Sequence, residues 1–181
     1  MKKIDKIAID VGHARGTGAS GNGLQEHEVC EQIALYLRNE LHAHGLCVGV
    51  YDFPGKSNSG DLVATAQAVN AGGFGLCVSL HCDSASSGDA RGAHVIYVSE
   101  TGEKVAAAIA KHLCPIMPGR ANRTVKRGNL YILNNTRCPA VLVECGFLTN
   151  TRDASMLRDE KKQIARAIAA GIVEFIDNAN L

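Results

Sequence analysis

Apolar and polar residues follow two different periods along this chain, and the two alternate. An amphipathic helix is predicted from Glu26 to His44, because apolar residues recur there at every fourth position and Gly45 follows. Short apolar runs bounded by turn residues predict strands at 6–11, 46–51, 74–81, 92–98, 129–133 and 140–144. Further helices are predicted at 61–71, 101–117, 153–158 and 161–177, the first of them capped by Asp61.

This alternation predicts an α/β fold. Strands that alternate with helices form a mainly parallel (mixed) central β-sheet, here of about six strands, with helices on both faces. The length of 181 residues fits a single domain over 1–181, without linkers or repeats. Ligands of such sheets bind beyond the carboxyl ends of the strands.

Composition narrows the function classes. A net charge of +1 argues against a nucleic-acid binder, and 46% hydrophobic residues argue against disorder. We find no apolar run of the ~18–20 residues that a membrane span needs, and we identify no signal peptide. The seven cysteines include no C-x-x-C pair and are spaced like core residues, which predicts buried reduced thiols and folding in a reducing compartment.

Three predicted strands end in residues able to bind a metal or transfer protons. The first runs into His13, the strand 74–81 ends at His81, and the strand 140–144 ends at Glu144. If these strands are parallel neighbours, the three side chains converge at one sheet edge, close to Glu26 at the start of the long helix. Two imidazoles and one carboxylate form a common catalytic zinc set, and the spare carboxylate can act as a general base on water.

Other residues allow weaker alternatives. The remaining histidines fit structural roles better than metal binding: His27, His42, His44, His94 and His112. Cys82 and Cys145 each follow a candidate site residue, so a Cys–His nucleophile is an alternative, although adjacent strand residues point to opposite faces. The loop 16–21 contains G-x-G-x-x-G, but the helical pattern begins only near Glu26, which favours an active-site loop over a dinucleotide site.

The chain resembles the zinc-dependent N-acetylmuramoyl-L-alanine amidases of the amidase-3 type over about residues 6–176. The resemblance lies in D-V-G-H at 10–13, the helix-opening Glu26, S-L-H-C-D at 79–83 and P-A-V-L-V-E-C-G-F-L-T-N at 139–150. It implies that His13, Glu26 and His81 bind Zn²⁺ and that Glu144 is the catalytic acid/base. It also favours Glu26 over the nearby Glu28 or Glu31 as the ligand.

The chain departs from the family pattern at several points. Asp83 stands where the family usually has Asn, and Arg15 stands near a position that is often a second Gly. The long inserted helix that blocks the site in some members has no counterpart near Pro118–Ala121, so we expect an open site. This compact form most resembles phage-endolysin catalytic domains.

The resemblance implies hydrolysis of the amide between N-acetylmuramic acid and L-alanine in peptidoglycan. We expect a monomer that acts on the cell wall without nucleic acid, membrane or a separate wall-binding domain. Targeting would come from the domain itself, a partner or a further segment. Without a signal peptide, the chain would leave the cytoplasm by phage-type release or another route. The rival classes are a nucleotide-dependent enzyme using the loop 16–21 and a peptidoglycan-binding module without catalysis.

Overall fold

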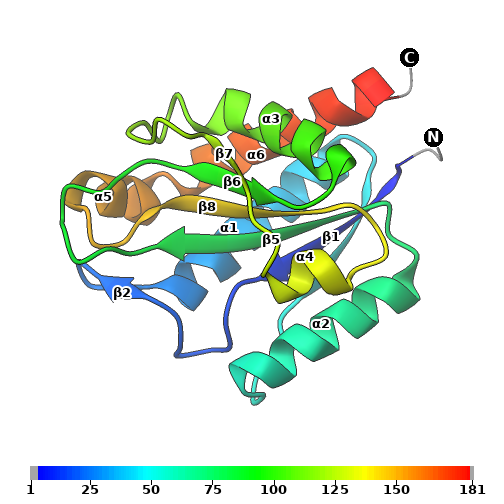
Figure 1. Ribbon diagram of the computed structural model, residues 1–181, viewed down its shortest axis with the longest axis horizontal. Coiled ribbons are helices and arrows are strands. Elements are labelled where there is room, and N and C mark those ends of the chain that lie inside the picture. The colour runs from blue at the N-terminus through cyan, green and yellow to red at the C-terminus, as the bar shows by residue number, and fades with distance from the viewer. Residues whose placement is uncertain (1–3, 180–181) are drawn as a thin grey trace.

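The structure is a computed structural model that describes residues 4–179, and its centre is a six-stranded sheet between two layers of helices (Figure 1). The strands lie in the order β4 (Cys47–Tyr51), β1 (Lys6–Val11), β5 (Leu76–Asp83), β8 (Ala140–Phe147), β6 (His94–Tyr97) and β7 (Thr124–Lys126). All neighbouring pairs are parallel except β6 and β8, which are antiparallel. The predicted α/β fold with a mixed sheet is therefore confirmed.

Helices cover both faces of this sheet. One face packs against α1 (Glu26–Ala43), α3 (Glu100–Leu113) and α6 (Lys161–Ala179), and the other against α2 (Asn58–Gly72) and α4 (Tyr131–Asn135). α5 (Thr151–Asp159) follows β8, and a short hairpin of β2 (Ser20–Gly21) and β3 (Leu24–Gln25) lies between β1 and α1.

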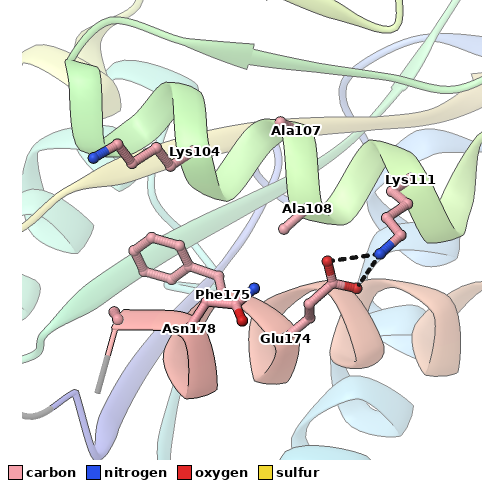
Figure 2. Close-up of a pocket in the computed structure, with 8 residues that line it drawn as sticks. Lys104, Ala107, Ala108, Lys111, Glu174, Phe175 and Asn178 are labelled. Atoms are coloured by element: carbon pink, nitrogen blue, oxygen red, sulfur yellow. Dashed lines mark hydrogen bonds and ion pairs between the residues drawn. The ribbon is translucent and has the colours of Figure 1, made fainter. Parts of the chain in front are cut away.

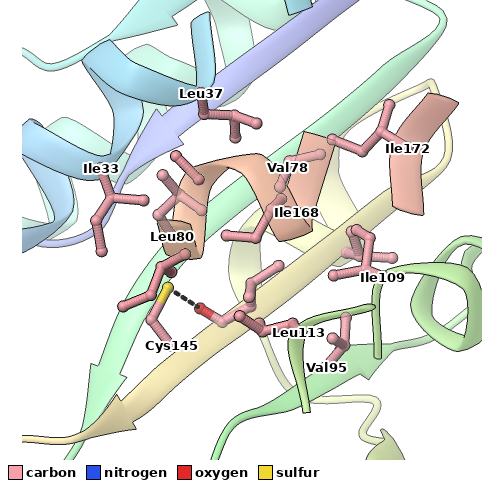
Figure 3. Close-up of a cluster of buried hydrophobic side chains, with 14 of the residues drawn as sticks. Ile33, Leu37, Val78, Leu80, Val95, Ile109, Leu113, Cys145, Ile168 and Ile172 are labelled. Carbon is pink, nitrogen blue, oxygen red and sulfur yellow. Dashed lines mark hydrogen bonds between the residues drawn. The ribbon is translucent and has the colours of Figure 1, made fainter. Parts of the chain in front are cut away.

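The larger core lies between the sheet and the layer formed by α1, α3 and α6. Val78 and Leu80 of β5 point into it together with Leu37 of α1 and Ile168 of α6 (Figure 3). β5 and β8 read as nearly continuous apolar runs because residues on both of their faces are buried. This core fixes the strands whose ends carry the candidate site. Within residues 4–179, no helix combines the length and apolar character needed to span a membrane.

The opposite face of the sheet is apolar at one end of the strands and polar at the other. Near the amino-terminal ends of β5 and β8, Cys77 and Ala140 pack against α2 and α4 in a smaller apolar cluster. Alternation then places Ser79, His81 and Glu144 on the same face nearer the carboxyl ends of β5 and β8. The polar residues of the sheet are thus concentrated at one end of one face.

Two local predictions are wrong. The segment 129–133 is predicted as a strand, but residues 131–135 form α4, in which the consecutive residues Ile132 and Leu133 are both buried. Asp61 is not the cap of α2, because Ser57 is the N-cap and its hydroxyl accepts a hydrogen bond from the Gly60 amide. Asp61 instead accepts a hydrogen bond from the Phe53 amide in the preceding loop.

The seven cysteines are all free thiols, and most lie where the sequence predicts. Cys138 is half-buried and Cys47 is exposed at the start of β4, whereas the others are buried: Cys30, Cys77, Cys82, Cys114 and Cys145. The prediction of a buried thiol is therefore wrong for Cys47. The predicted single domain 1–181 includes residues 1–3 and 180–181, which lie outside the described residues.

Candidate functional site

The turn after β1 brings His13 to the carboxyl edge of the sheet. Gly12 donates its amide hydrogen to the Leu80 carbonyl at 2.9 Å, and a Cβ on Gly12 would collide with that carbonyl and with the His81 ring. His13 itself has a φ of 63°, a left-handed conformation that is uncommon for residues other than glycine. This backbone geometry places the His13 and His81 rings edge to face, with centroids 5.0 Å apart.

Glu26 is buried where α1 begins. Its Oε2 accepts a hydrogen bond from the Ala19 amide at 2.7 Å, and its Oε1 accepts one from the Cys82 amide at 3.0 Å. Two backbone amides therefore hold the carboxylate in one orientation. Of the other two glutamates considered in this helix, Glu28 is exposed and Glu31 pairs with Arg15 at 3.6 Å.

The glycine loop 16–21 forms one wall of this site. A Cβ on Gly18 would lie 2.8 Å from Oε2 of Glu26 and 2.9 Å from Cδ2 of His13. The loop continues into the β2–β3 hairpin, so α1 begins at Glu26 and not inside the glycine motif. A dinucleotide-binding motif needs a helix N-terminus within the motif, and this chain has none there.

The structure brings three of the predicted site residues together. His13 Nε2 lies 3.2 Å from Glu26 Oε2, and His81 Nδ1 lies 3.0 Å from Glu26 Oε1. One ligand atom from each residue lies within 4.8 Å of the other two. Burial opposes ionisation of Glu26, but hydrogen bonds with His13 and His81 outweigh it and hold the Glu26 pKa below its usual value.

This arrangement offers a metal ion two imidazole nitrogens and a carboxylate oxygen, a ligand set that zinc commonly takes. Burial opposes protonation of His81, but the hydrogen bond with Glu26 and the nearby carboxylates outweigh burial, so the pKa of His81 lies above its usual value. A proton on this imidazole would compete with a metal for the same nitrogen.

Glu144 lies beside this cluster on the neighbouring strand. It is the register partner of His81, so both side chains project from the same face of the sheet. Burial raises the pKa of Glu144 to about 7, and among the described residues its Oε2 has no hydrogen-bond partner. Glu144 and the three clustered residues share the lining of a cavity of about 350 Å³ with Asp83. A carboxyl group with a pKa near 7 can both accept and return a proton.

Asp10 and Ser79 form a polar pair on the same face of the sheet, two residues before His81 along β5. Ser79 donates its hydroxyl hydrogen to Oδ2 of Asp10 at 2.5 Å, and both side chains are buried. Burial raises the pKa of Asp10 although this hydrogen bond opposes the change. No role for Asp10 is predicted from the sequence, although a buried acid at the end of an apolar strand is itself a signal of a hydrogen-bonded network.

Two of the other candidate histidines contact carboxylates outside the cluster. His27 is buried against Asp52 at 3.2 Å, and His112 contacts Glu174 at 2.7 Å. The Cys82 and Cys145 thiols are buried, and their pKa values lie well above the usual value, which argues against a thiolate nucleophile.

A larger cavity lies elsewhere, between α3 and α6 (Figure 2). It has a volume of about 460 Å³, and Lys111 and Glu174 form an ion pair at 2.8 Å in its lining. Its other lining residues are mainly small or apolar, and they include no histidine or cysteine. The smaller cavity at the sheet edge, in contrast, is lined by two histidines and three carboxylates: His13, His81, Glu26, Asp83 and Glu144.

The chain matches a protein family described as N-acetylmuramoyl-L-alanine amidase over residues 7–174. The N-acetylmuramoyl-L-alanine amidase LytC of Bacillus subtilis is 32% identical, over 94% of this chain and 35% of LytC. The N-acetylmuramoyl-L-alanine amidase CwlM of Bacillus licheniformis is 33% identical, over 92% of this chain and 67% of CwlM. This chain thus spans about a third of the length of LytC.

Solved structures show the same fold. The catalytic domain of the CD27L endolysin, which targets Clostridia difficile, superimposes with a TM-score of 0.86 at 28% identity. That similarity covers 93% of this chain and 97% of the endolysin domain. The six-stranded sheet and its helices therefore correspond to a complete catalytic domain of that endolysin.

Proposed function

Because the chain belongs to the amidase-3 family of N-acetylmuramoyl-L-alanine amidases, we propose that it is a zinc-dependent hydrolase of peptidoglycan. The bond cleaved is the amide between the lactyl group of N-acetylmuramic acid and L-alanine. The observation that carries this proposal is the position of Glu144 beside the cluster of His13, Glu26 and His81. This cluster offers metal ligands, and Glu144 offers a proton acceptor directly next to them.

In the proposed reaction, His13, Glu26 and His81 hold the metal. Bound zinc would supply a Lewis acid that polarises the substrate carbonyl and makes a coordinated water more acidic. The amides of Ala19 and Cys82 keep the Glu26 carboxylate fixed. Preorganised ligands of this kind lower the cost of assembling the site.

Glu144 is the proposed acid/base. In its ionised form it accepts a proton from the attacking water, and it then delivers that proton to the departing nitrogen of L-alanine. Burial raises the pKa of Glu144 to about 7. Near neutral pH this carboxyl group can therefore both accept the proton from water and release it to the departing nitrogen.

We further propose that the described residues act as one catalytic unit on the cell wall, as a monomer whose macromolecular partner is peptidoglycan. The similarity to the N-acetylmuramoyl-L-alanine amidase LytC supports this. The unit would reach the wall through its own affinity for peptidoglycan, through a partner or through a further segment.

The decisive experiment is mass spectrometry of muropeptides released from purified peptidoglycan. The protein is tested alone, after chelation, and after chelation followed by restored zinc. We expect stem peptides with a free L-alanine amino group that disappear on chelation and return with zinc. A zinc-loaded, folded protein that binds peptidoglycan but releases no such peptide would contradict the proposal and favour a binding module.

A further inference from the structure

His94 lies beside Glu144 in the sheet. The two residues are register partners in the antiparallel pair β6 and β8, and Ile96 and Leu142 are partners two positions along. Ile96 and Leu142 both pack into the smaller apolar cluster, so alternation along the strands places His94 and Glu144 on that same face. Side chains directly opposite each other on adjacent strands have Cβ atoms about 5 Å apart. His94 is therefore an immediate neighbour of the proposed acid/base.

Both side chains carry a buried polar atom without a protein partner. His94 is only 2% exposed, yet its Nδ1 makes no hydrogen bond with any described residue, and neither does Oε2 of Glu144. Most buried polar side-chain atoms in folded proteins are paired with protein or with ordered water. Two such atoms on directly opposite residues can satisfy each other through a single bridging water molecule.

The protonation state of His94 suits a bridge of this kind. Burial, together with the charges of Arg120 and Arg127, lowers the pKa of His94 to about 4, so its imidazole is neutral near neutral pH. One nitrogen of a neutral imidazole carries a hydrogen and the other does not. With the hydrogen on Nδ1, His94 donates to the water and the water donates to Oε2 of Glu144. Oε2 accepts that hydrogen bond whether Glu144 is ionised or protonated on Oε1, so the bridge persists through the proposed proton transfer.

A bridge to Oε2 fixes the direction of the other carboxyl oxygen. Glu144 is half-buried and contributes to the lining of the cavity at the proposed metal ligands. Since Oε2 is the buried oxygen, Oε1 is the one that can reach a water molecule in that cavity. His94 does not belong to the cavity lining, so it contacts Glu144 from the side that faces away from the substrate.

We propose that His94 is a positioning residue for Glu144: its imidazole holds Oε2 through one water molecule and so keeps Oε1 directed at the attacking water. This inference rests on the proposed function, in which Glu144 takes and returns the proton. A carboxylate that is oriented before the substrate binds loses less conformational freedom on the way to the transition state. His94 should therefore act on kcat, with little effect on KM or on zinc content.

The test compares two substitutions of similar size, His94→Leu and His94→Asn. We measure kcat and KM on a synthetic muramoyl peptide, with zinc content and melting temperature on the same preparations. Leucine removes the hydrogen-bond donor, so kcat should fall about 10- to 100-fold, while KM and zinc content stay at their wild-type values. Asparagine keeps a donor near the position of Nδ1, so its kcat should lie within about threefold of the wild type. If His94→Leu does not fold, His94→Ala, which also lacks a donor, takes its place.

A double substitution shows whether His94 acts through Glu144. In the Glu144→Gln background, His94→Leu should reduce the residual kcat by less than about twofold, because the carboxylate that His94 positions is already gone. A kcat of His94→Leu close to the wild type would overturn the inference. Equal losses in His94→Leu and His94→Asn, or an undiminished loss in the Glu144→Gln background, would overturn it as well, since both indicate packing.

Those outcomes leave the amidase function standing, because the wild type still cleaves the muramoyl peptide. A folded, zinc-loaded wild type that cleaves no muramoyl peptide would instead refute the amidase function and, with it, the role of His94.

Discussion

The two halves of the site differ in how their polar atoms are satisfied. In the half formed by His13, Glu26 and His81, the carboxylate oxygens accept hydrogen bonds from backbone amides and contact both imidazoles. In the half formed by Glu144 and His94, each side chain keeps one buried polar atom without a partner among the described residues.

This difference suits the two halves to different tasks, the first to metal binding and the second to proton transfer. A fully hydrogen-bonded cluster is rigid, which suits the binding of a metal ion. An unpartnered carboxyl oxygen has a raised pKa and is ready to exchange a proton with a bound molecule, which suits catalysis. The first half should therefore control metal content, and the second should control turnover.

The largest effect is expected from a substitution in the cluster of His13, Glu26 and His81. His13→Ala removes one proposed ligand, so zinc content should fall well below one equivalent and amidase activity should fall to background. Metal analysis after gel filtration and muropeptide release measure both quantities. A variant that still holds one equivalent of zinc would refute the assignment of His13.

Breaking the second half should leave the first intact. Glu144→Gln keeps the shape of the side chain but cannot accept a proton, so activity should fall by about 10²- to 10⁴-fold. Zinc content should stay at one equivalent, measured on the same preparation. Activity close to that of the wild type would remove Glu144 from the mechanism.

Alanine substitutions at Gly16 and Gly18 test the ligand cluster without changing a ligand. Gly16 and Gly18 have similar φ values of 77° and 87°, so alanine strains the backbone at both positions. Only at Gly18 would the added Cβ collide with Glu26 and His13, since nothing lies within 4 Å of a Cβ on Gly16. Gly18→Ala should therefore weaken zinc affinity by about 10- to 100-fold.

Competition with a fluorescent chelator measures this affinity. Gly16→Ala is the control for backbone strain and should change the affinity much less. Equal losses in the two variants would show that strain in the loop, and not the collision with the cluster, is responsible.

The smallest expected effect concerns stability. Burial raises the pKa of Glu144 from 4.5 to about 7, so the metal-free folded protein loses stability as pH rises from 4.5 to about 7, where the buried carboxyl must ionise. Glu144→Gln removes this cost. It should stabilise the chelated protein by about 1–3 kcal/mol above pH 7 and have little effect near pH 4.5.

Melting temperatures of chelated wild type and Glu144→Gln at pH 5 and pH 8 test this difference. The variant should melt at a higher temperature only at pH 8. A stabilisation of equal size at both pH values would point to packing and not to charge.

The elements with long or continuous apolar patterns could be predicted from the sequence. The helix predicted at 26–44 is α1 at Glu26–Ala43, and the strand predicted at 6–11 is β1. The segment 129–133 could not, because a few apolar residues fit either period. β7 was missed because its three residues are half-buried or exposed, and its pairing with β6 alone makes it a strand.

The site shows the same division. The sequence and the family resemblance indicated His13, Glu26, His81 and Glu144, because strand and helix ends mark them. The orientation of His94 could not be read locally, since it depends on the register between β6 and β8, which lie about fifty residues apart in the chain. The role of Gly18 likewise depends on where the loop folds back, which no local pattern records.

The exposed thiol of Cys47 has a practical consequence. Cys47 lies beside Lys6 at the amino-terminal end of β1, whereas His13 follows the carboxyl end of that strand. Five steps of about 3.3 Å along β1 place the thiol at least about 16 Å from the candidate site. The buried thiols are shielded, so a maleimide should react first at Cys47. The native chain could thus be immobilised on a bead with its candidate site directed towards an added suspension of cell walls.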